Sequence, residues 1–107
     1  MDLRGAETLI DELAKLIDAG PGANPEGLRR VGEICWEFRN AEDCDHFLAE
    51  KLHDARTMFE YWFSARGWQQ WGADGEGARA ILGNDLQNVR LAVTACFGDK
   101  PGNGVMA

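Results

Sequence analysis

Residues 41–66 read AEDCDHFLAEKLHDARTMFEYWFSAR, and they separate by chemistry when they are projected on an α-helix. At about 100° per residue, one broad face collects the apolar side chains of Cys44, Phe47, Leu48, Leu52, Ala55, Met58, Phe59, Trp62 and Phe63. The opposite face collects His46, Glu50, His53, Thr57, Glu60 and Ser64. This pattern predicts a long helix that buries one side against a core.

Three other segments show the same helical spacing of apolar residues. Residues 7–19 carry a stripe of Leu9, Ile10, Leu13, Leu16 and Ile17; the segment that starts at Pro25 carries Leu28, Val31, Ile34, Cys35 and Phe38; residues 78–97 carry Leu82, Leu86, Val89, Val93 and Phe97. The run Gly83-Asn84-Asp85 is expected to interrupt the last of these helices. With four amphipathic helices and short connections, the chain is predicted to be an all-α, single-domain four-helix bundle with a broken fourth helix.

Helix boundaries are marked by polar caps and glycines. Asn24 precedes Pro25, and this order predicts an N-cap followed by a proline in the first helical position. Asp43 or Asp45 is expected to cap the helix in residues 41–66, and Gly67 to end it. The glycine-rich residues 72–77 are expected to form a loop. The bundle is assigned to residues 1–97, and residues 98–107 are expected to form a flexible C-terminal tail.

The chain of 107 residues has 11 Lys and Arg against 18 Asp and Glu, a net charge of −7. This charge disfavours direct binding to nucleic acid and anionic membranes, favours solubility, and would steer a basic protein surface towards the chain. No segment is apolar enough for a membrane span, and no signal peptide is recognisable. The three cysteines are odd in number and lack C-x-x-C spacing, so they are expected to pack in the core in a reducing compartment. A cytoplasmic location is therefore expected.

The sequence contains one arrangement that resembles a metal-binding motif. Glu50 and His53 form an E-x-x-H pair, and His46 lies on the same helix face. Both histidines project away from the apolar stripe, and a di-iron core site would need matching ligands on a second helix. A surface site of His46, Glu50 and His53 is kept as an alternative, but the preferred prediction is that there is no metal and no cofactor.

No catalytic constellation is recognisable, and the chain is predicted not to be an enzyme. The cysteines lie at apolar stripes, where a thiol is a poor nucleophile. Ser64 is outside any G-x-S-x-G elbow, and no phosphate-binding glycine loop is present. Asp85 is the acid nearest to a predicted core, at the border of the fourth helical stripe.

Aromatic and apolar residues remain after the core is assigned. Trp36 and Leu91 project away from their helical stripes, Tyr61 flanks the core face of the long helix, and Trp68 and Trp71 begin the glycine-rich loop. Because Trp and Tyr dominate binding hot spots, these five residues are the predicted partner-binding set. The alternative is that the loop tryptophans, Trp68 above all, plug one end of the bundle.

These observations lead to one functional hypothesis and two alternatives. The leading hypothesis is a non-catalytic protein-binding module that docks on a basic partner: an inhibitor, an immunity-type or counter-defence factor, or an adaptor. A homodimer that uses Trp36 and Leu91 is an open variant of it. The alternatives are the metal-binding bundle and a nucleic-acid mimic that occupies a basic channel.

Overall fold

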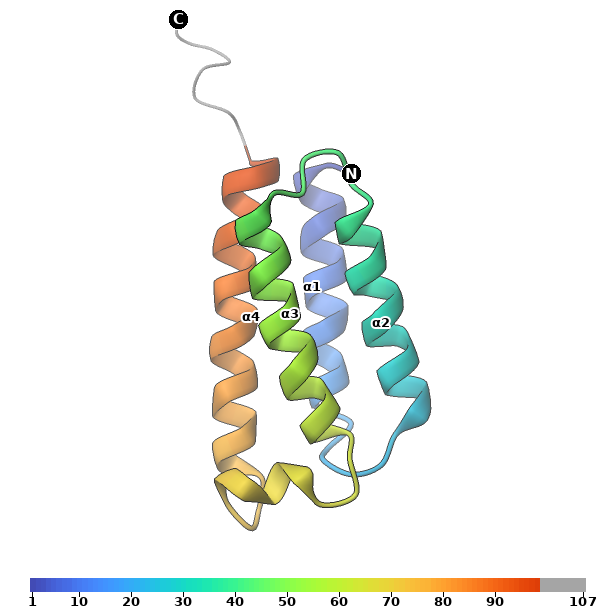
Figure 1. Cartoon of the computed structure of the whole chain (residues 1–107), viewed down its shortest axis with the longest axis vertical. Helices are drawn as coiled ribbons and strands as arrows, with labels where there is room; N and C mark the ends of the chain where they lie inside the picture. The colour runs from blue at the N-terminus through green and yellow to red at the C-terminus, as the bar shows by residue number, and fades with distance from the viewer. Residues whose placement is uncertain (99–107) are drawn as a thin grey trace, which may run out of the picture.

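The computed structural model describes residues 1–98 and forms an antiparallel helical bundle (Figure 1). Its elements are α1 (Leu3–Ile17), α2 (Pro25–Arg39), α3 (His46–Trp62), the short 3₁₀-helix η1 (Gly67–Trp71) and α4 (Glu76–Phe97). The α-helices alternate in direction along the chain, and residues 1–98 contain no strand. The predicted all-α four-helix bundle is confirmed. All of the predicted tail except Gly98 lies outside the described residues.

Side-chain caps define where the first three α-helices begin. Carboxylate or amide oxygens of Asp2, Asn24 and Asp45 accept hydrogen bonds from backbone N–H groups three residues further on, at 2.8, 2.9 and 2.8 Å. Each bond satisfies an N–H that has no partner within its helix. The predicted caps Asn24 and Asp45 are thus confirmed. Because Asp2 also acts as a cap, α1 begins at Leu3 and is longer at its start than the sequence pattern indicated.

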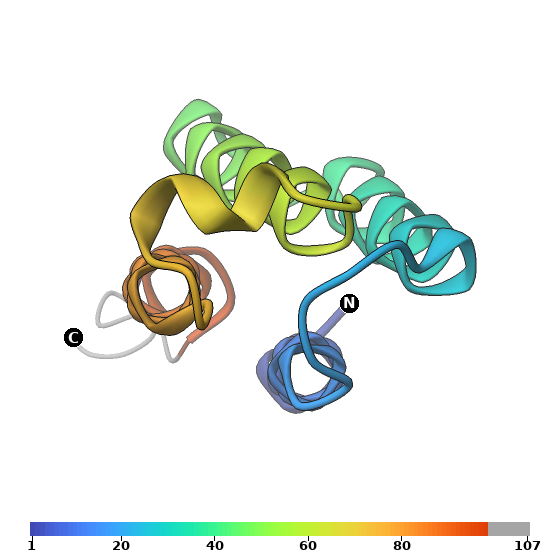
Figure 2. The same ribbon diagram turned by 90° about the horizontal axis from the view of Figure 1, so that it is seen from below.

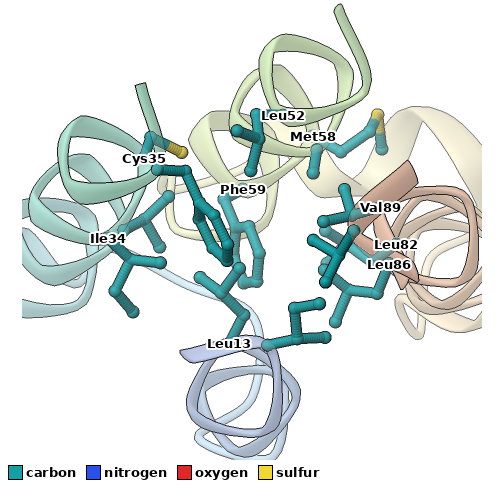
Figure 3. Packing of buried hydrophobic residues seen from close by; sticks show 14 of the residues in the cluster. Leu13, Ile34, Cys35, Leu52, Met58, Phe59, Leu82, Leu86 and Val89 are labelled. Atoms are coloured by element: carbon teal, nitrogen blue, oxygen red, sulfur yellow. The ribbon is translucent and has the colours of Figure 1, made fainter. Parts of the chain in front are cut away.

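One hydrophobic core runs between the helices (Figure 3). Phe59 of α3 points into its centre, between Leu13 of α1 and Ile34 of α2, while Leu82, Leu86 and Val89 of α4 fill the other side. The largest side chains with almost no solvent exposure are Trp62, Phe38, Phe59 and Phe63. Cys35 and Cys96 are buried among these apolar residues, as the sequence predicted.

The apolar faces are narrower than the helical projection indicated. Phe47 is 50% exposed, and its ring lies under the ammonium of Lys51 at 5.2 Å. The buried positions of α3 start at Leu48, so Phe47 falls to one side of the line that meets the neighbouring helices. Four other residues predicted in the stripes are only partly buried, at the border of the core: Leu9, Leu16, Leu28 and Cys44.

The predicted interruption of the fourth helix is wrong. α4 is one helix through Gly83, Asn84 and Asp85, because burial of Leu82 and Leu86 on either side holds these residues in register. The predicted glycine-rich loop is found at residues 72–75, and the residues before it form the 3₁₀-helix η1, which crosses beneath the bundle from α3 to α4 (Figure 2). α3 itself is shorter than residues 41–66, since Asp45 caps it and Phe63 ends it.

The four helices do not pack equally closely. α3 with α4, α1 with α4 and α2 with α3 share wide contacts, whereas α1 and α2 touch least among these neighbours. A bidentate ion pair between Glu12 of α1 and Arg30 of α2 bridges that narrow contact. α2 therefore lies at the edge of the bundle, with much of its outer surface uncovered. Within residues 1–98, no helix combines the length and apolar character that a bilayer span requires.

Candidate partner-binding surfaces

The structure separates the predicted partner-binding residues into three places. Trp36 lies on the outer face of α2, and Leu91 lies on α4 beside α1. Tyr61, Trp68 and Trp71 gather where η1 closes the end of the bundle. The predicted set is therefore not one surface.

The cluster at η1 is part of the fold. The rings of Tyr61 and Trp71 meet edge to face, with centroids 5.1 Å apart. Trp68 and Trp71 pack against the core, and a Cβ atom on Gly75 would lie 3.3 Å from the Trp68 ring. These contacts support the alternative that the tryptophans plug the bundle end, so we remove Trp68 and Trp71 from the candidate surface.

Trp36 has the opposite character. It is 66% exposed, the most exposed of the large apolar residues in residues 1–98. It is flanked by hollows on both sides of α2, one towards α1 and one towards α3. A tryptophan in this position presents a rigid aromatic surface to solvent next to two hollows, as binding hot spots do.

The hollow towards α1 is mainly apolar. It has a volume of about 470 Å³ and is lined by Met1, Gly5, Leu9, Trp36, Glu37, Asn40 and Ala41. Glu37 is its only charged side chain. The hollow follows from the narrow contact between α1 and α2, which leaves Leu9 only partly covered.

The hollow towards α3 is polar and positively charged. It has a volume of about 480 Å³ and is lined by Gly32, Cys35, Trp36, Arg39, Asn40 and Arg56. A smaller hollow next to it shares Cys35, Arg39 and Arg56 and adds Ala49, Leu52 and His53. The Arg56 guanidinium reaches across from α3 to α2, since a Cβ atom on Gly32 would lie 3.5 Å from its Nη2 atom. The guanidinium therefore lies next to the outer surface of α2 at Gly32.

Cys35 lies beneath these two arginines. Its burial raises the pKa of the thiol, and the positive charges of Arg56 and Arg39 oppose that rise. Because a raised pKa keeps the sulfur protonated at neutral pH, Cys35 is a poor nucleophile.

Leu91 forms a separate and smaller feature. It is 59% exposed and borders a groove of about 160 Å³ between α1 and α4. Arg90 pairs with Asp11 across these helices at 3.0 Å. This groove shares no residue with the hollows around Trp36.

The two histidines have different surroundings. His46 Nε2 lies 3.0 Å from a Glu50 carboxylate oxygen, and both side chains are exposed. His53 instead lines the hollow that contains Arg39 and Arg56, where positive charge disfavours a metal cation. In the part of the chain that the structure describes, no three His, Cys, Asp or Glu side chains are grouped to hold a metal ion.

Comparison with protein-family models, with curated proteins and with solved structures finds no match.

The arginine-lined hollow is the feature that sequence reasoning missed. Arg39 is three residues after Trp36, so their nearness on one helix was visible in the spacing. Arg56 comes from another helix, and nothing in the linear pattern indicates that its side chain reaches Gly32. Met1, which lines the other hollow, had no sequence signal either.

Proposed function

We propose that this chain is a non-catalytic protein-binding module, of inhibitor or adaptor type, whose contact surface is centred on Trp36. The observation that carries the proposal is the 66% exposure of Trp36 between two hollows. Tryptophan is enriched at binding hot spots, and Trp36 borders an apolar hollow instead of standing alone on the surface. Both hollows are open, which suits a protein segment lying across α2.

The charge distribution refines the kind of partner. The net charge of −7 supports attraction of a basic protein over long range, as predicted from composition. Next to Trp36 the charges are mixed, with Glu33 and Glu37 on one side and Arg39 and Arg56 on the other. The proposed partner is therefore a protein that approaches through its overall positive charge and docks through a surface carrying both signs. We also propose a cytoplasmic location, on the basis of charge and cysteine content.

Site-specific photo-crosslinking tests the module. A photoreactive phenylalanine analogue is placed at position 36 and, as a control, at the exposed Gln70 of η1. We expect an adduct with one protein at position 36 and none at position 70. The purified adduct partner should then bind the unmodified chain, and Trp36→Ala should weaken that binding by about tenfold or more.

Three results would count against this surface. Identical adducts from both positions, or unchanged affinity after Trp36→Ala, would reject Trp36 as the contact. An adduct of this chain with itself, together with a dimer mass by light scattering, would replace the external partner with a second copy.

A further inference from the structure

Arg39 and Arg56 differ from the other arginines of this acidic chain because, within residues 1–98, they lack a carboxylate partner and also line one hollow, whereas Arg4 and Arg66 lack such a partner but lie outside that hollow. Arg29, Arg30, Arg79 and Arg90 each pair with carboxylates, including Glu26, Glu12, Asp18 and Asp11. Within residues 1–98, neither Arg39 nor Arg56 lies within ion-pair distance of a carboxylate. The two line the same hollow, and the residues that line it and its smaller neighbour include no Asp or Glu.

We propose that this hollow between α2 and α3 binds an acidic peptide segment of the partner, with carboxylates on Arg39 and Arg56 and an apolar side chain against Trp36. The inference rests on the proposed function, because it takes the ligand to be part of a protein. It specifies that the hollow beside Trp36 selects a segment that carries carboxylates.

Charge complementarity favours this occupant. A planar guanidinium donates two parallel hydrogen bonds to a carboxylate, so two arginines in one hollow provide a double carboxylate site. Their like charges repel each other, and an anion between them relieves that repulsion. Trp36 borders the same hollow, so an apolar side chain next to the carboxylates would pack against the Trp36 ring while the carboxylates bind the arginines.

A nucleic acid fits this surface less well. Its phosphates continue beyond a hollow of about 480 Å³, and on the far side of Trp36 they would meet Glu33 and Glu37. The net charge of −7 adds to that repulsion. A short segment with a few carboxylates ends within the hollow and carries less charge, so it meets less of this repulsion.

The test uses defined probes and nuclear magnetic resonance of the full chain. The first probe is the blocked peptide acetyl-Glu-Phe-Glu-Leu-Glu-amide, the second has glutamine in place of each glutamate, and the third is a thymidine pentanucleotide. The signals followed are the Trp36 indole N–H and the guanidinium N–H groups of Arg39 and Arg56. We expect the glutamate peptide to shift these signals, the glutamine peptide to leave them in place, and added salt to weaken the binding.

Matched variants separate the hollow from general charge. The double variant Arg39→Gln with Arg56→Gln should lose about tenfold or more in affinity for the glutamate peptide. Arg4→Gln with Arg66→Gln removes the same charge from two exposed arginines outside the hollow and should change affinity less than about twofold. Equal losses in both double variants, equal binding of the glutamine peptide, or tighter binding of the oligonucleotide would overturn the proposal.

The outcomes also distinguish this inference from the proposed function. If a crosslinked partner binds through Trp36 but tolerates the double variant of Arg39 and Arg56, the acidic-segment inference fails and the module remains. If the glutamate peptide binds through both arginines while crosslinking at position 36 yields no protein adduct, the hollow is an anion site and the module proposal fails.

Discussion

Asp85 shows how one partly buried charge affects stability. Its carboxylate lies at the border of the core on α4, and burial raises its pKa above the ordinary value, with repulsion from Asp54 adding to the rise and Lys51 opposing it. A raised pKa means that the fold disfavours the charged form. The cost is therefore present at neutral pH, above the folded-state pKa, and disappears as the pH falls below the unfolded-state value.

We accordingly expect Asp85→Asn to stabilise the chain at neutral pH by roughly 0.5–1 kcal/mol, a gain reduced by partial exposure. The gain should vanish in acid, where the carboxyl group is protonated in both states. Urea unfolding across the acidic range measures both. Glu60→Gln, on the exposed side of α3, is the control and should leave stability unchanged. A gain that persists in acid would show that the charge is not its cause.

Two glycines of α4, Gly77 and Gly83, have different surroundings. A Cβ atom on Gly77 would lie 1.9 Å from the Trp71 carbonyl oxygen, whereas a Cβ atom on Gly83 would meet nothing within 4 Å. Gly77 is thus required where η1 approaches the start of α4, while Gly83 has no such constraint.

Gly83→Ala should therefore raise the free energy of unfolding by roughly 0.5–1 kcal/mol through helix propensity. Gly77→Ala should lower it by about 2 kcal/mol or more, because backbone atoms must move apart. Thermal unfolding of the two single variants measures both changes, and each variant is the control for the other because the substitution and the helix are the same. Equal effects would contradict the close approach of η1 to α4.

An ion pair stabilises the contact between α1 and α2. Arg30 donates two hydrogen bonds to Glu12, and this bonding lowers the pKa of the Glu12 carboxyl group. A lowered pKa stabilises the fold above the unfolded-state value, and that contribution is lost as the pH falls through the folded-state pKa. The pair thus supports the narrow contact between α1 and α2 at neutral pH.

Glu12→Gln is expected to cost up to about 1 kcal/mol at neutral pH, since the pair is partly exposed, and to cost less in acid. Arg30→Lys keeps the charge but removes the two-pronged geometry and should lose part of the same stability. Hydrogen exchange of the α2 amides, alongside urea unfolding, shows whether the loss is local to that helix. An unchanged stability at every pH would contradict a structural role for the pair.

For the molecule as a whole, the residues near one another in the sequence predicted the helices, whereas the packing of the helices determines which side chains are exposed. Helix number, the caps Asn24 and Asp45, and the central stripe of α3 were readable because each depends on neighbours within a few residues. The rest depends on how the helices rotate and meet. Phe47 is exposed, Trp68 and Trp71 pack against the core, and Arg56 reaches α2 because of contacts between elements distant in sequence.

The exposure of Trp36 has a consequence for the tryptophan fluorescence of this protein. Trp62 is buried and Trp36 is exposed, so collisional quenchers in solution should reach the Trp36 indole first. Although the chain as a whole is an anion, Arg39 and Arg56 border that indole. If the arginine side dominates over Glu33 and Glu37, the ratio of iodide to caesium quenching should be higher for this indole than for a free tryptophan derivative in the same salts, so that this comparison reports the local potential at α2 and not the average over the surface.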